Sequence, residues 1–119
     1  EAGGGEEEAK ANAKEKGDLE NVMQWSRDNN FEAIHKWANE VQGEGGKLPL
    51  NAYRYILIAA VRHGYEEECS YWLESMTRDY DIAPQDIPVV TRALCVCGKL
   101  EEALDLIFSA LQKAKIRRF

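Results

Sequence analysis

The chain has 119 residues, 45% of them hydrophobic and 30% charged, which fits one ordinary soluble domain and hardly two. No apolar run approaches the ~18 residues that a membrane-spanning helix needs. The formal net charge is −6. Because nucleic-acid binding relies on clustered Lys and Arg, this acidic balance does not favour a nucleic-acid partner by default. Composition therefore favours a soluble protein without a transmembrane segment.

The cysteines and the first residue indicate in which kind of cellular compartment the protein is found. There are three cysteines, an odd number without the spacing of a disulfide framework, which favours a reducing compartment. The first residue is Glu1 rather than methionine, and we interpret the chain as a processed form or a fragment from which any targeting peptide has been removed. Cytosol, mitochondrial matrix and plastid stroma all suit these features.

The first segment, residues 1–17, is predicted to be a flexible acidic and Gly-rich tail. Gly3, Gly4 and Gly5 open it, and no large apolar residue occurs before Leu19. A helix formed here has no apolar face to bury, so we expect disorder or a solvated helix. Residues 113–119, at the other end, carry four basic residues and form a predicted basic tail.

Residues 18–112 are predicted to form a helical-repeat domain. Apolar residues recur there at helical spacing, and short polar, Gly or Pro breaks divide the region into six helices. The helices pair into three repeats, at about 18–49, 50–84 and 85–112. Gly64 is expected to end a helix in the left-handed conformation, and Pro84 to block further helix before the third repeat.

A period of 35 residues relates the three repeats. It links Trp37 to Trp72 and Ile107, and it links Val41 to Met76 and Leu111. A single hairpin cannot cover its own apolar face, so stacked neighbours supply the core. We therefore predict an all-α fold, a right-handed α-solenoid of about three helix–turn–helix hairpins. Its predicted repeat core consists of Trp37, Val41, Ile56, Leu57, Trp72, Met76, Leu104, Ile107 and Leu111.

The second and third repeats resemble pentatricopeptide repeats. Residues 98–106 read Gly-Lys-Leu-Glu-Glu-Ala-Leu-Asp-Leu, close to the commonest hairpin sequence of that family, and residues 64–76 match it more loosely. The tetratricopeptide repeat is the runner-up, but its signature Trp belongs on the first helix of the hairpin. Trp37 and Trp72 lie on the second helix, so we prefer the pentatricopeptide interpretation.

The resemblance implies an organellar protein, mitochondrial or plastid, that binds single-stranded RNA one base per repeat. The family's base-reading roles fall here on Arg54 and Pro88, with Gln85 and Leu50 at the second role. The usual readers at the first role are Asn, Thr or Ser, and proline cannot donate a hydrogen bond to a base. This departure favours a protein partner, in an accessory or assembly subunit of a larger complex.

Single-stranded RNA binding stays open as the alternative function. In that case we expect Arg54, Arg92 and the basic end of the chain to contact phosphate groups. A protein partner of acidic character is another possible occupant of the basic end. The candidate partner- or RNA-binding residues are Arg54, Gln85, Pro88, Arg92, Lys113, Lys115, Arg117 and Arg118.

We expect no enzyme activity, no cofactor and no metal. Cys95 and Cys97 are two positions apart, which on a helix places them on opposite sides, so they cannot hold one metal ion. We expect the cysteines to be buried structural residues. His35 and His63 lie in different repeats, and neither has a nearby nucleophile that would form a triad.

Overall fold

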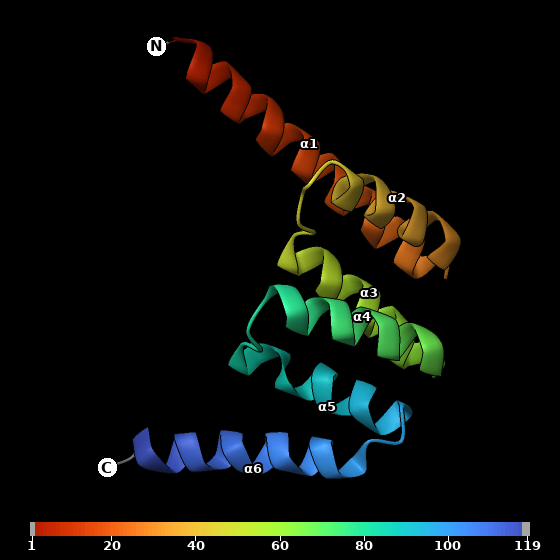
Figure 1. Ribbon diagram of the computed structural model, residues 1–119, viewed down its shortest axis with the longest axis vertical. Coiled ribbons are helices and arrows are strands. Elements are labelled where there is room, and N and C mark those ends of the chain that lie inside the picture. The colour runs from red at the N-terminus through yellow and green to blue at the C-terminus, as the bar shows by residue number, and fades with distance from the viewer. Residues whose placement is uncertain (1, 118–119) are drawn as a thin grey trace. The chain divides into compact units, whose positions relative to one another are not determined.

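The computed structural model describes the backbone of residues 2–117 and the side chains of residues 14–114. This part of the chain is all-helical, without a strand, as the sequence predicts. It divides into two compact units, residues 1–56 and residues 57–119. Figure 1 gives the labels of the helices.

The first unit contains two paired helices and the start of a third. Helix α1 spans Ala2–Arg27, α2 spans Phe31–Gly43, and α3, Leu50–His63, begins in this unit. α1 packs on α2. Val22 of α1 is fully buried, as is Ile34 of α2, and Trp37 is almost completely buried. These positions recur at helical spacing, so burial follows the apolar pattern of the sequence.

Helix α1 is longer than the sequence pattern predicts. It continues without a break through residue 17, where we placed the boundary between the tail and the repeat domain. Glycine, alanine and charged residues make up most of its first half, which contains no large apolar residue, so a helix there has no apolar face to bury. An exposed ion pair joins Lys14 Nζ to Glu44 Oε2 at 3.9 Å, but such contacts stabilise by about 0–1 kcal/mol at most.

The second unit contains the rest of α3 and four further elements. α4 spans Glu66–Asp79, the short 3₁₀ helix η1 spans Pro84–Asp86, α5 spans Ile87–Val96, and α6 spans Leu100–Arg117. α5 packs on η1, α4 and α6, so it lies between the two longer helices (Figure 1). Cys69, Trp72 and Met76 of α4 and Val90 and Ala93 of α5 are buried.

Helix ends in both units use the same backbone turn. Asn29, Gly45, Gly64 and Gly98 have positive φ angles of 57°, 80°, 64° and 75°. In each case the next residue's N–H donates to the carbonyl five positions earlier, for example Tyr65 N to Ala60 O at 3.1 Å. This is the Schellman arrangement, which satisfies carbonyls that the last helical turn leaves unpaired. The predicted left-handed conformation of Gly64 is confirmed.

The predicted repeat core is buried in α2, α3 and α4 and exposed in α6. Trp37, Ile56, Leu57, Trp72 and Met76 are buried, and Val41 is half-buried. The prediction is wrong for Leu104, Ile107 and Leu111 of α6, which are 52%, 38% and 60% exposed. α6 packs on α5 through one side, and no element of the described second unit covers the other side. A stacked repeat core needs a neighbour on both sides.

Candidate functional site

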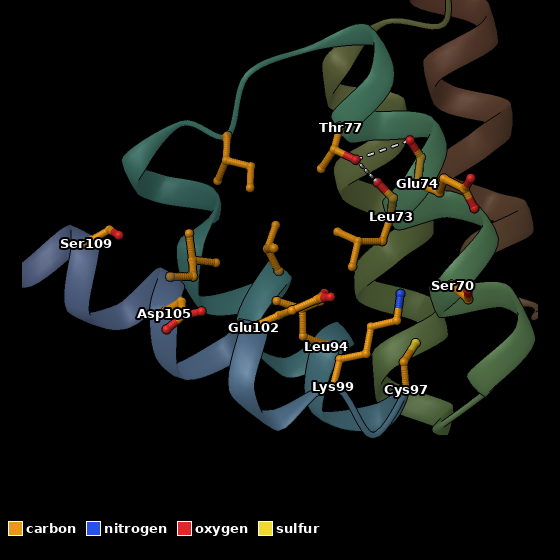
Figure 2. A pocket seen from close by; sticks show the side chains of 13 residues that line it. Ser70, Leu73, Glu74, Thr77, Leu94, Cys97, Lys99, Glu102, Asp105 and Ser109 are labelled. Carbon is orange, nitrogen blue, oxygen red and sulfur yellow. Dashed lines mark hydrogen bonds between the residues drawn. The ribbon is translucent and has the colours of Figure 1, made fainter.

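The candidate site is a groove between α4 and α6, with α5 and the α4–α5 connection between them. Two cavities of about 690 and 940 Å³ form it. They share the lining residues Thr77, Ile82, Leu106 and Ser109, so they are one continuous depression. We call it the α4–α6 groove. Its first part is seen from close by in Figure 2.

Helical spacing places the lining residues of both walls. α4 contributes positions 70, 73, 74 and 77, and α6 contributes positions 102, 105, 106 and 109. Both sets follow the spacing i, i+3, i+4, i+7, which gathers side chains on one face of a helix. Each helix therefore turns one complete stripe toward the groove.

The groove has an apolar floor and a polar rim. Leu73, Val90 and Leu94 line the floor and are nearly fully buried. Ser70, Glu74, Thr77, Lys99, Glu102, Asp105 and Ser109 stand along the rim (Figure 2). This combination of an apolar base with a few polar groups is typical of binding clefts.

The rim carries more acidic than basic charge. The lining residues include four carboxylates, Glu74, Asp81, Glu102 and Asp105, and two ammonium groups, Lys99 and Lys113. Four negative and two positive charges leave a formal balance of −2. A ligand that places basic side chains along the rim is therefore favoured over an acidic one.

Two polar side chains of the groove, Thr77 and Cys97, form hydrogen bonds to backbone carbonyls of α4. Thr77 Oγ1 donates to the carbonyl of Leu73 at 2.9 Å and to that of Glu74 at 3.2 Å, as Figure 2 shows. At the end near the start of α6, Cys97 Sγ donates to the carbonyl of Glu66 at 3.7 Å. Burial raises the pKa of the Cys97 thiol, Lys99 opposes that rise, and Glu66 adds to it.

The opposite side of α6 presents a second surface. Leu100, Leu104, Ile107, Phe108 and Leu111 are exposed, and we call them the outer stripe. The inward side of the same helix carries the buried Ala103 and the half-buried Leu106 and Ala110. Most large apolar side chains in the described part of α6 thus face solvent, whereas an ordinary surface helix turns such side chains inward.

The binding residues predicted from the sequence are mostly outside the groove. Gln85, Pro88 and Arg92 lie on η1 and α5 and are exposed, but they line neither cavity. Lys113 does line the groove, at its far end. Arg54 belongs to the first unit, is half-buried, and donates through its Nη1 to Asn51 Oδ1 at 2.9 Å. The side chains of Lys115, Arg117 and Arg118 lie outside the described residues.

The cysteines and histidines differ in their surroundings. Cys69 is buried, as expected, and burial raises its pKa to about 11, with smaller contributions from Cys97 and Glu68. The prediction of burial is wrong for Cys95, which is exposed, and Cys97 is intermediate. Across residues whose side chains are described, no three His, Cys, Asp or Glu residues gather as metal ligands. His63 is exposed and stacks on Tyr65, with ring centroids 5.5 Å apart.

Sequence reasoning missed the groove and the outer stripe as surfaces. It placed Leu104, Ile107 and Leu111 in the core and did not single out Ser70, Thr77 or Ser109. The signal for the stripe was present, since Phe108 beside Ile107 widens the apolar face beyond what one neighbour can cover. The groove joins residues from four segments, so no single sequence window contains it.

Comparison with known proteins identifies no relative, so the function is inferred from the geometry of the structure. No protein-family model, no curated protein and no solved structure matches this chain. Within the described part of the chain, none of the helices combines the length and hydropathy that crossing a membrane requires.

Proposed function

We propose that this protein is a non-catalytic helical-repeat interaction module that binds a helical segment of a partner protein in the α4–α6 groove. The observation that carries the proposal is the groove itself, whose apolar floor is walled by two helices. A helix laid into such a groove buries its own apolar face, with contacts at i, i+3, i+4 and i+7. The acidic balance of the rim selects a segment with Lys or Arg beside that face.

The repeat architecture is part of the same proposal. The hairpin turns at Asn29, Gly64 and Gly98 share their left-handed backbone and follow one another at 35 and 34 residues. The second helices of the hairpins begin at Phe31, Glu66 and Leu100, at the same two steps. These regularities support three copies of one pentatricopeptide-like unit in a right-handed solenoid.

The wider setting follows from the resemblance. A pentatricopeptide-like module without the usual base-reading side chains suits an accessory or assembly subunit of a larger organellar complex. Arg54 supports this view, because it bonds within its own helix, and Pro88 has no donor to offer a base. Free cysteines fit a reducing compartment of that kind.

Selection from a library of ~15-residue helical peptides on the full chain tests the groove. We expect enrichment of peptides with apolar residues at i, i+3, i+4 and i+7 and with flanking Lys or Arg. Ser109→Trp, which fills both cavities from the rim, should weaken the selected peptides at least ~10-fold, as judged by fluorescence anisotropy. Gln112→Trp is the matched control, since this exposed residue of the same helix lines neither cavity.

Two outcomes would contradict the proposal. One is the absence of any enriched helical motif, and the other is undiminished binding by the Ser109→Trp variant. Single-stranded RNA is the competing ligand, so the same chain is titrated with labelled oligoribonucleotides at about 50 mM salt, where phosphate contacts are strong. Tight, salt-sensitive RNA binding that is lost in Arg54→Ala or Arg92→Ala would replace the protein partner by RNA.

A further inference from the structure

Two of the three cysteines, Cys69 and Cys97, lie against the same turn of α4. Cys97 caps the C-terminal end of α5, and its Sγ points toward α4 and donates to the backbone carbonyl of Glu66 at 3.7 Å (Figure 2). Cys69 follows Glu66 by three positions, and a helical side chain covers the turn that precedes its own Cα. The side chain of Cys69 therefore lies over the turn that the sulfur of Cys97 contacts, and the two thiols are neighbours.

The pKa of the Cys69 thiol agrees with this arrangement. It is raised to about 11, chiefly by burial and next by the charge of Cys97, whose effect exceeds that of the adjacent Glu68. An electrostatic interaction weakens with distance, so Cys97 acts on Cys69 because the packing of α5 on α4 brings the two sulfur atoms together. The hydrogen bond of Cys97 and the pKa of Cys69 thus indicate the same proximity.

The three thiols differ in their access to solvent and to one another. Cys69 is fully buried. Cys97 has intermediate exposure and lines the α4–α6 groove at the end near the start of α6, where a dissolved reagent can reach it. Cys95 is exposed, but helical geometry places it on the opposite side of α5 from Cys97. Among the three cysteines, Cys97 alone is both open to a reagent and beside a second thiol.

We propose that Cys69 and Cys97 form an intramolecular disulfide when the chain meets a small-molecule disulfide such as oxidised glutathione. The Cys97 thiolate attacks one glutathione sulfur, which leaves a mixed disulfide on Cys97 and releases one glutathione thiolate. The Cys69 thiolate then attacks Cys97 Sγ and releases the second glutathione thiolate. The two released thiolates take up the protons that the two cysteines lose. Two protein thiols are thereby oxidised to one disulfide, and one glutathione disulfide is reduced to two thiols.

The disulfide ties the start of α4 to the turn between α5 and α6. Its formation gives up the hydrogen bond from Cys97 Sγ to the Glu66 carbonyl, which is weak because a thiol is a poor donor. In return, the bond closes a loop and restricts the unfolded chain, so the oxidised protein is more stable than the reduced one. Burial raises the pKa of both thiols, so little thiolate is present at neutral pH and the exchange is slow there.

Two variants with two cysteines each test the pairing. Cys95→Ser keeps the proposed pair, and Cys97→Ser, the matched control, keeps Cys69 with Cys95. Each folded chain is incubated with a small excess of oxidised glutathione at about pH 8.5, where more thiolate is present, and the products are identified by intact mass and non-reducing peptide mapping. Cys95→Ser should lose two hydrogen atoms and retain no glutathione, with the link mapped to Cys69 and Cys97. Cys97→Ser should carry glutathione on Cys95 and leave Cys69 unmodified.

Repeating the oxidation in concentrated urea separates the effect of the fold from that of the chain. The two cysteine pairs enclose loops of nearly equal length, because Cys95 and Cys97 are two positions apart, and the entropy of loop closure changes slowly with length. Both variants should therefore form their disulfide at similar rates in urea. Without urea, Cys95→Ser should do so at least ~10-fold faster than Cys97→Ser. Equal rates in the folded chains, or glutathione that stays on Cys97 of the Cys95→Ser chain, would overturn the proposal.

Thermal unfolding measures the effect of the bond on stability. The oxidised Cys95→Ser chain should melt about 10 °C higher than the same chain after reduction, because the disulfide restricts the unfolded state. Circular dichroism should show the same helix content in both forms. An unchanged or lower melting temperature of the oxidised chain would show that the fold does not place the two thiols to pair, and it would overturn the proposal. No ligand of the α4–α6 groove is used in these experiments, so failure of one proposal is distinguishable from failure of the other.

Discussion

Helices α4 and α6 carry the same sequence pattern and meet different surroundings. Trp72 and Met76 of α4 are each 1% exposed, whereas Ile107 and Leu111, 35 residues later, are 38% and 60% exposed. Both helices pack on α5. The pattern thus marks which side chains are available for packing, and the surroundings of the helix decide whether they are buried.

Alanine substitutions at these equivalent positions should give the largest difference in the free energy of unfolding. Trp72→Ala and Met76→Ala each remove a fully packed side chain and should lower the free energy of unfolding by about 2–5 kcal/mol. Ile107→Ala and Leu111→Ala remove exposed side chains and should cost under about 1 kcal/mol. Urea denaturation followed by circular dichroism makes the comparison. Equal costs at the two helices would show that α6 is covered in solution.

The hairpin turns allow a second comparison, between left-handed and ordinary glycines. Gly64→Ala and Gly98→Ala introduce a Cβ at φ angles of 64° and 75°, which should cost about 1–2 kcal/mol each. Gly43→Ala is the control, because Gly43 lies in helix α2 with open space around it and should gain up to ~1 kcal/mol from helix propensity. A neutral Gly64→Ala would argue against the Schellman turn.

Cys69 of α4 and Cys95 of α5 compare a buried with an exposed thiol. The pKa of Cys69 near 11, against an ordinary value of 9.0, leaves roughly a hundredfold less thiolate at pH 8, and burial blocks access as well. Iodoacetamide at pH 8 should therefore modify Cys95 long before Cys69, as followed by peptide mass spectrometry. Modification of both at one rate would show that α4 opens readily.

The same shift has a consequence for stability against pH. The folded protein holds the Cys69 proton more tightly than the unfolded chain, so the contribution of this thiol is fully present below about pH 9. It is lost progressively as the pH rises toward 11. The expected measurement is a free energy of unfolding that falls over this window more steeply for the wild type than for Cys69→Ala.

The smallest expected effect on the free energy of unfolding comes from a comparison of the indole N–H groups of two tryptophans. Trp72 Nε1 donates to Glu68 Oε1 at 3.3 Å, while the Nε1 of the buried Trp37 finds no partner among the described residues. Ala33 occupies the position of α2 that Glu68 occupies on α4, four residues before the tryptophan. Ala33→Gln should supply an acceptor and raise the free energy of unfolding by about 0.5–1.5 kcal/mol. Ala33→Leu, which adds bulk without an acceptor, is the control in thermal unfolding.

Most of the local structure could be predicted from the amino-acid sequence. Apolar spacing predicts six helices, and the described residues form six α-helices besides the short η1. Gly64 marks a helix end because its left-handed backbone costs little without a Cβ. Helix α1 departs from the prediction, because its first half has no apolar face by which a sequence pattern could reveal it. Burial of Cys69 was predicted correctly from its core position, and burial of Cys95 was not.

The sequence by itself determined the helices, their turns and the list of side chains able to form a core. Tertiary structure alone decided which of those side chains are covered. The outer stripe of α6 is exposed because burial needs a neighbour that the helix's own residues do not specify. The α4–α6 groove likewise exists only because α5 holds together two stripes that are 32 residues apart in the chain. Periodicity acts within one helix, while a binding surface depends on the distance between helices.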